Sequence, residues 1–144
     1  MEIVQTYKYL LVIALAWLIA HLIKAIIEKQ NGQRKKFFNN FFASGGMPSA
    51  HTATVVSLAL LIGLELGFNS AIFALAILFT AITMHDAMRV RWSAGENSKA
   101  INKIIKNSKL SIPIVKRKQG HTKAEVMAGG VLGALIAIVV FITT

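Results

Sequence analysis

A chain of 144 residues has the length of a single domain, and we predict one domain across residues 1–144. Its hydrophobic fraction of 55% and charged fraction of 15% exclude an ordinary soluble domain, which carries more charge. The absence of cysteine excludes a disulfide framework and a thiolate metal site, while the net charge of +10 suits either nucleic acid or an anionic membrane surface.

Four apolar blocks follow one another along the chain. About 20 residues, and at least roughly 17, are needed to span a hydrocarbon core. The first and fourth blocks are long enough, the second is near the limit, and the third needs its polar extension through His85 and Asp86. We therefore predict an all-α membrane bundle of about four transmembrane helices. The blocks are Tyr9–Ile27, Ala50–Leu66, Ala71–Met84 and Val126–Thr144.

The segment Gly45-Gly46-Met47-Pro48-Ser49-Ala50-His51-Thr52 leads into the second block. The two glycines free the backbone, Pro48 fixes the turn, and the Ser49 hydroxyl can cap the helix that follows. The N–H groups of that first helical turn, together with the helix dipole, favour an anion such as phosphate. The alternative is an ordinary N-cap followed by a half-buried His51.

Beyond the third block the chain becomes polar and basic. Three lysines alternate with isoleucines at helical spacing, which predicts a short helix at the membrane interface, ended by Pro113. A solvated loop is the alternative. The lysines are Lys99, Lys103 and Lys106.

The last block begins near His121 and Glu125, which are four residues apart and so share one face of a helix. A carboxylate bonded to one ring nitrogen fixes the histidine tautomer and leaves the other nitrogen free to attack. Gly129, Gly130 and Gly133 on the same block favour close helix packing. Elsewhere, the pattern favours a packing role for His21 and an interfacial one for Glu65.

Basic residues are concentrated in two connections. Five lie between Lys24 and Lys36 and ten between Arg89 and Lys123, which leaves only Lys8 elsewhere. The positive-inside rule then places both connections in the cytoplasm and both termini outside the cytoplasmic (inner) membrane. Because no nucleic-acid recognition module accompanies these charges, we expect a membrane and no nucleic acid as partner.

Three segments together resemble a known family. Gly45–Thr54, Asp86–Gly95 and Gly120–Gly129 are similar to the divergent branch of the type 2 phosphatidic acid phosphatase superfamily, whose relatives include vanadium haloperoxidases. Pro48-Ser49-Ala50-His51 fits the Pro-Ser-x-His motif, with alanine where the larger superfamily has glycine. The arginine expected six residues before His121 falls on Val115.

The resemblance implies a role for each matching residue. His121 would be the nucleophile that forms a phosphohistidine, Glu125 would hold its ring, and His51 would transfer protons. A phosphate cradle would come from Lys24, Arg34, Ser49 and Arg91, with Asp86 orienting Arg91. Lys35 or Lys36 would serve in place of the loosely spaced first-motif residues, and Arg117 is a weaker substitute than Arg91.

The implied activity is hydrolysis of a phosphorylated lipid at the cytoplasmic face, with no metal and no cofactor. The four spans are fewer than the six helices usual in the superfamily, which favours a homodimer as a hypothesis. Two other functions stay open: a non-enzymatic phospholipid-binding or transport protein, and a metal-dependent hydrolase. Ligands for the latter would come from His51, His85, Asp86, His121 and Glu125.

Overall fold

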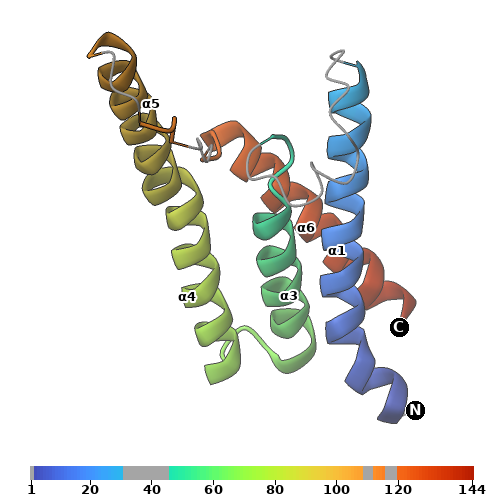
Figure 1. The fold of residues 1–144 in the computed structure, drawn as a ribbon. Coiled ribbons are helices and arrows are strands. Elements are labelled where there is room, and N and C mark those ends of the chain that lie inside the picture. The colour runs from blue at the N-terminus through green and yellow to red at the C-terminus, as the bar shows by residue number, and fades with distance from the viewer. Residues whose placement is uncertain (1, 31–45, 109–111, 116–119) are drawn as a thin grey trace.

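The computed structural model describes residues 2–30, 46–108, 112–115 and 120–144. Its described residues form helices and connecting turns, without a strand, which confirms the predicted all-α bundle (Figure 1). The helices are α1 (Glu2–Gln30), α3 (Ala50–Leu66), α4 (Ala71–His85), α5 (Arg91–Asn107) and α6 (Lys123–Thr143), with a π-helical turn η1 (Asp86–Val90) between α4 and α5.

Three helical stretches are long and apolar enough to cross a membrane: Tyr7–Gln30, Ala71–Asn107 and Lys123–Thr143. The remaining apolar helix, α3, has 17 residues and so a length of about 25 Å, slightly less than the roughly 30 Å of a hydrocarbon core. The helix of the third predicted span is therefore longer than its apolar block, because it continues through the polar residues His85 and Asp86. Of the four apolar helical stretches, the shortest is α3, the second span.

The helix that begins at Ala71 runs without interruption to Asn107, a stretch of 37 residues. A helix of this length measures about 55 Å, so a part of it must project beyond the membrane if α4 spans the core. The basic helix expected at the interface is thus the continuation α5 and not a separate element, and Figure 1 shows it following the line of α4.

α3 occupies the centre of the bundle and packs against α1, α4 and α6. Small side chains let these helices approach closely, as is usual in membranes. A Cβ atom added to Gly129 would meet the carbonyl of Ser49, and one added to Gly133 would meet the backbone of Ala53. The close packing predicted for these glycines is therefore present. The core comprises Val12, Ala16 and Ala20 of α1, Ala50, Ala53 and Leu61 of α3, and Ile136, Ala137 and Val140 of α6.

Serine caps fix the starts of α3 and α4. The Ser49 side chain accepts from the Thr52 N–H, as predicted, and the Ser70 side chain accepts from the Phe73 N–H. Between the two helices Gly67 has a φ of +88°, a left-handed conformation that favours glycine. The observed α3 therefore begins and ends where its sequence predicts.

The two ends of α3 define two regions of the bundle. We call the end at Ala50, where the starts of α3 and α6 meet the turn η1, the polar end. At the other end of α3, Glu65 forms an ion pair of 2.5 Å with Lys8 of α1, and the two side chains are only 17% and 5% exposed.

Candidate functional site

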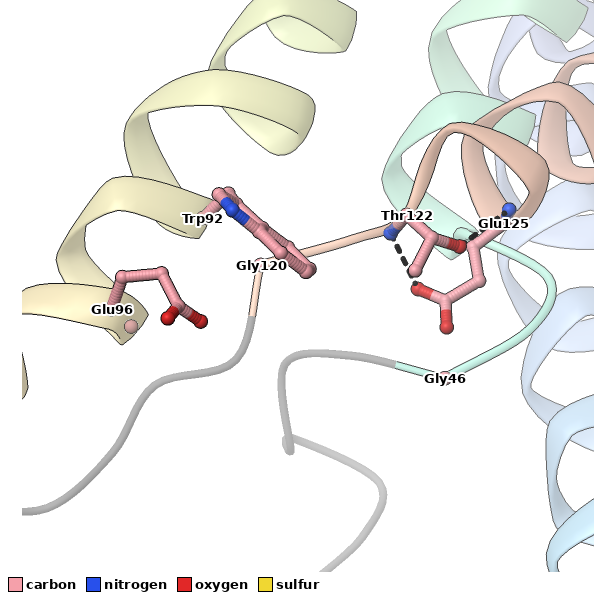
Figure 2. A pocket seen from close by; sticks show the side chains of 7 residues that line it. Gly46, Trp92, Glu96, Gly120, Thr122 and Glu125 are labelled. Atoms are coloured by element: carbon pink, nitrogen blue, oxygen red, sulfur yellow. Dashed lines mark hydrogen bonds between the residues drawn. The ribbon is translucent and has the colours of Figure 1, made fainter. Parts of the chain in front are cut away.

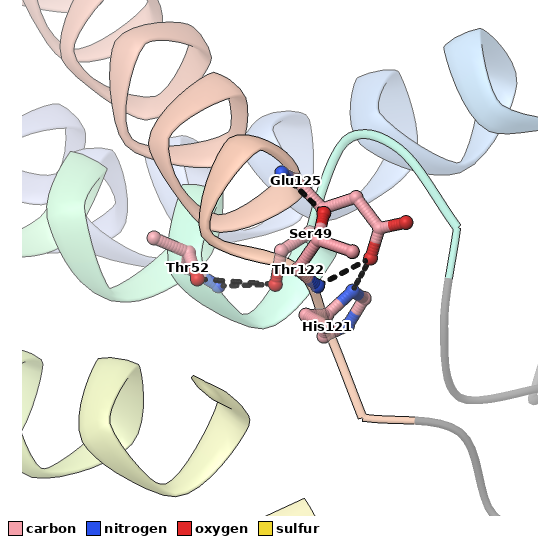
Figure 3. Close-up of polar contacts among 5 residues, drawn as sticks. All are labelled: Ser49, Thr52, His121, Thr122 and Glu125. Atoms are coloured by element: carbon pink, nitrogen blue, oxygen red, sulfur yellow. Dashed lines mark hydrogen bonds and ion pairs between the residues drawn. The ribbon is translucent and has the colours of Figure 1, made fainter. Parts of the chain in front are cut away.

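His121 and Glu125 are in contact at the polar end. The His121 Nδ1 atom lies 3.0 Å from the Glu125 Oε2 atom, and His121 is buried, with 6% exposure (Figure 3). A carboxylate in this position holds the ring in one orientation and favours the tautomer protonated at Nδ1. The arrangement is the one expected of a positioned nucleophile or base.

Glu125 has a second, structural reason to be present. Its Oε2 atom accepts the Thr122 N–H at 3.1 Å, while the Thr122 hydroxyl accepts the Glu125 N–H at 3.2 Å. These two bonds form a capping box at the start of α6. The spacing Thr122-x-x-Glu125 is the sequence signature of that motif, and it identifies a cap at this position that sequence reasoning missed. One carboxylate oxygen thus serves the helix and the histidine together.

The backbone around His121 is tied to two other segments. The His121 N–H donates to the Ala87 carbonyl of η1 at 3.1 Å, and the Ser49 N–H donates to the Glu125 carbonyl at 3.0 Å. Gly120 lies so close to Trp92 that an added Cβ atom would overlap its backbone nitrogen. The start of α6 therefore docks directly on η1 and on the start of α3.

Arg91 and Asp86 form an ion pair beside this junction. Arg91 Nε donates to Asp86 Oδ2 at 2.7 Å, and both side chains remain partly exposed, at 40% and 38%. Asp86 holds one nitrogen of a guanidinium that has further donors available for an anion. The structure therefore places Asp86 where an orienting role for Arg91 requires it.

His51 lies in the first turn of α3 and its side chain is exposed. Its ring is within electrostatic range of Arg91 and His121. His51, Arg91 and Asp86 line an open pocket of about 420 Å³. The remaining wall is mostly apolar and includes Val55 of α3 with Phe79 and Ile82 of α4, so the pocket has a charged end and an apolar side.

A smaller pocket of about 150 Å³ lies on another side of the junction and is lined by two carboxylates, Glu96 and Glu125, together with Trp92 and Thr122 (Figure 2). Carboxylates at its wall would repel a phosphate. An anion is therefore better matched by the pocket of His51 and Arg91.

Two of the predicted cradle residues lie apart from that pocket. Lys24 is buried, with 7% exposure, next to Gly46, and its charge interacts with Glu28 and Glu125. Ser49 is fully buried, and its hydroxyl oxygen accepts from the Thr52 hydroxyl at 3.0 Å. The structure thus gives Ser49 the role of a cap. Arg34, together with Lys35, Lys36 and Arg117, lies outside the described residues.

The His21 ring is bonded to the Trp17 carbonyl at 2.8 Å and packs on the Trp17 ring, with 4.3 Å between centroids. This agrees with the packing role that the sequence favours. Trp17 also lines the pocket of His51 and Arg91. No local pattern around Trp17 predicts that position.

The ligands of the alternative metal site do not gather. Within the described ranges, no group of three or more histidine, aspartate or glutamate side chains is arranged to hold a metal ion. His85, one of the proposed ligands, is an exposed residue at the end of α4.

Comparison with known proteins places the chain in a family. Residues 6–136 match the model of the Divergent PAP2 family. The chain is also 34% identical to the uncharacterized membrane protein YuiD of Bacillus subtilis (strain 168), over 96% of both chains. No solved structure matches. A match that covers nearly all of the sequence, including all three segments of the site, shows that the chain belongs to the Divergent PAP2 family.

Proposed function

We propose that this membrane protein is a phosphatase that releases phosphate from a phosphorylated lipid through a phosphohistidine at His121. The observation that carries the proposal is the contact of His121 Nδ1 with Glu125, in a segment held by η1 and α3, beside a pocket that contains His51 and Arg91. Family membership supports a phosphatase-like membrane protein, and the side chains supply the chemistry.

The reaction would proceed in two balanced steps. The unprotonated Nε2 atom of His121 attacks phosphorus while the bond to the lipid oxygen breaks, and protonated His51 gives its proton to that oxygen. Neutral His51 then takes a proton from water, whose oxygen attacks the phosphohistidine and releases inorganic phosphate. Both histidines return to their starting states, and Glu125 stabilises the positive charge that the His121 ring carries in the phosphohistidine.

During transfer the phosphate oxygens carry negative charge, which cationic side chains must neutralise. Arg91 is the best placed cation, because it lines the same pocket as His51 and is held by Asp86. Lys24 and Arg34 remain proposed phosphate ligands. For Ser49 a contribution through the backbone of the α3 start fits better than direct contact of its buried hydroxyl.

A lipid substrate is favoured over a soluble phosphate ester by the pocket wall. Phe79 and Ile82 extend from the charged end of the pocket along α4, a helix long enough with its extension to span the membrane. Contact between an apolar chain and such a surface is favourable, because it removes both from water. Phosphatidylglycerol phosphate, phosphatidic acid and a polyprenyl diphosphate all combine a phosphate with an apolar chain.

The basic residues favour one orientation. With the connections that contain Lys24–Lys36 and Arg89–Lys123 in the cytoplasm of the inner membrane, the polar end would face the cytoplasm and both termini would lie outside. A homodimer would complete the lipid groove that a bundle this small leaves open. Both statements are part of the proposal.

The burial of His121 favours a second candidate function, that of a non-enzymatic phospholipid-binding or transport protein. Its side chain is 6% exposed, so phosphorus would reach Nε2 only after neighbouring side chains move. A binding protein would retain the anion pocket of His51 and Arg91 and would need no such movement.

The two functions are separated by one experiment. The purified full-length protein in lipid nanodiscs is offered the three lipid phosphates, with and without a chelator, and phosphate release is measured. We expect release that resists the chelator and is abolished in His121→Ala and His51→Ala. A ³¹P signal of phosphohistidine should be present in the wild type when turnover is quenched with base, and absent from His121→Ala.

Unchanged release by His121→Ala would contradict the phosphohistidine mechanism, and release lost with the chelator would favour the metal-dependent alternative. Retained binding of lipid phosphate without release from any substrate would establish the binding protein. His85→Ala is the matched control, because His85 is an exposed histidine outside the pocket.

A further inference from the structure

The turn η1 contains one residue more than a turn of the α-helices on either side of it. The Arg91 N–H bonds to the Asp86 carbonyl, five residues earlier, whereas in an α-helix it would bond to Ala87, four residues earlier. The Ala87 carbonyl instead accepts the N–H of His121 at 3.1 Å. The extra residue therefore exchanges one helical hydrogen bond for a contact with the candidate nucleophile.

The same turn also determines where the Arg91 side chain lies. Residues five apart are separated by about 140° around an α-helix, which would place Asp86 and Arg91 on different faces. A turn closed by an i→i+5 bond brings the fifth residue back to nearly the same side, and here the two side chains are 2.7 Å apart. With Asp86 and Arg91 five residues apart, the ion pair therefore depends on the π turn.

We propose that η1 is a positioning element with two effects: its Asp86 side chain orients Arg91, the cation of the pocket and the residue that follows the turn, and its Ala87 carbonyl fixes the backbone of His121. The proposal rests on the proposed function for its effect on turnover. Single π turns inside α-helices are frequent at functional sites, where they redirect groups without ending the helix.

The close approach of Gly120 is consistent with this role. Its position leaves no room for a Cβ atom against Trp92, so the chain enters α6 directly on the backbone of the residues after η1. Ala87 itself is buried, with 3% exposure. The contact between η1 and His121 is therefore enclosed, and not a surface contact that water would replace.

Deletion of Val90 separates the two effects of η1, on Arg91 and on the backbone of His121. With that residue removed, Arg91 stands four residues after Asp86, so its N–H and side chain can both reach Asp86 in an ordinary α-helix. Trp92 then stands four residues after Ala87, and its N–H takes the Ala87 carbonyl. His121 loses its backbone partner while the ion pair is kept. Val90 is 57% exposed and has no other role in the site.

The test measures amide hydrogen exchange at single-residue resolution together with kcat and KM, for the full-length protein in nanodiscs. In the wild type the His121 amide should exchange more slowly than that of Lys123, an exposed residue in the first turn of α6, where N–H groups lack helical partners. Deletion of Val90 should speed exchange at His121 and lower kcat about 10²-fold with little change in KM, as expected for a displaced nucleophile.

Asp86→Asn should do the converse, raising KM while exchange at His121 stays slow. Deletion of Asn107, an exposed residue at the end of α5, is the matched control and should change neither quantity. Exchange at His121 as fast as at Lys123 in the wild type would overturn the proposal even if the Val90 deletion does not fold. Unchanged exchange after the deletion would also overturn it. Absence of phosphate release would contradict the proposed function alone, because the exchange measurements still decide the role of η1.

Discussion

The charged side chains at the two ends of α3 differ in their pairing and in their exposure. At the end near Leu66, Lys8 and Glu65 form a closed pair in which each charge has its counterion and little exposed surface. At the polar end, His51 is exposed and Arg91 is 40% exposed beside an open pocket. The closed pair has the geometry of a structural contact, whereas the polar end has partly exposed donors that line a pocket.

The carboxylates at the two ends illustrate the same difference. Glu65 neutralises a lysine on another helix, while Glu125 accepts bonds from its own helix start and from His121. Ionisable groups at membrane depth are costly, so we expect each to contribute to stability or to function. The two contributions can be measured separately by changing one end at a time.

Glu125→Gln should have the largest effect, on turnover. Glutamine is accepted at this position of a capping box, so the start of α6 should persist and the melting temperature should change little. The charge that stabilises the His121 ring is lost, and we expect turnover to fall about 10²–10⁴-fold with a smaller change in KM. Phosphate release and thermal unfolding are measured on the same preparation.

The matched variant at the other end is Glu65→Gln, for which turnover of the folded protein should stay at the wild-type level. Equal losses of turnover in the two variants would remove the distinction between the ends.

Breaking the closed pair should give the next largest effect, on stability. Lys8→Met leaves Glu65, whose side chain is 17% exposed, without its counterion, and breaking a buried pair on one side costs about 3–5 kcal/mol. The double variant Lys8→Met with Glu65→Leu should recover most of this loss, because two apolar residues replace both charges. Unfolding in mixed detergent micelles gives the free energies.

If the double variant were no more stable than the single one, the pair would not act as a unit. Loss of phosphate release from the refolded double variant would show that the Lys8 end also serves the reaction.

Gly129→Ala should have an intermediate effect that reaches the polar end through the backbone. The new methyl group would meet the Ser49 carbonyl, and overpacking of this kind costs about 1–3 kcal/mol. Displacement of Ser49 would also loosen its bond to the Glu125 carbonyl, so turnover should fall as well. Gly130→Ala is the control, because an added Cβ there lies 3.9 Å from Thr52, an ordinary contact. Similar thermal stability of the two variants would contradict the packing role of Gly129.

Local signals were enough to predict some of these features. The helix α3 begins after Ser49 and ends before Gly67, at the predicted residues, because a cap and a left-handed glycine act on their immediate neighbours. The contact of His121 with Glu125 follows equally from a spacing of four residues. Family resemblance supplied the roles, which the geometry accommodates for Arg91 and Asp86 and less directly for the buried Ser49.

Other features depend on contacts between distant segments, for which the sequence has no local signal. The pairing of Lys8 with Glu65 joins two helices, whereas the sequence pattern predicts only an interfacial position for Glu65. The π turn at Asp86 is favoured by the bond from His121, more than 30 residues later in the chain, so a pattern of hydrophobic residues around Asp86 does not reveal it. Lys24 was expected in the phosphate cradle, but the fold places it against Gly46 and the charge of Glu125.

The smallest predicted effect compares two caps of the same type. Ser49→Ala and Ser70→Ala each remove a hydroxyl that accepts an N–H at a helix start, which costs about 1 kcal/mol. Because Ser49 is fully buried and already bonded to Thr52, we expect its loss to leave KM for a lipid phosphate within about twofold of the wild type, close to the value for Ser70→Ala. A tenfold rise in KM for Ser49→Ala alone, at matched stability, would instead establish its hydroxyl as a phosphate ligand. That result would also require the pocket at the polar end to open as far as the α3 cap, since in the present structure the hydroxyl is closed to any ligand.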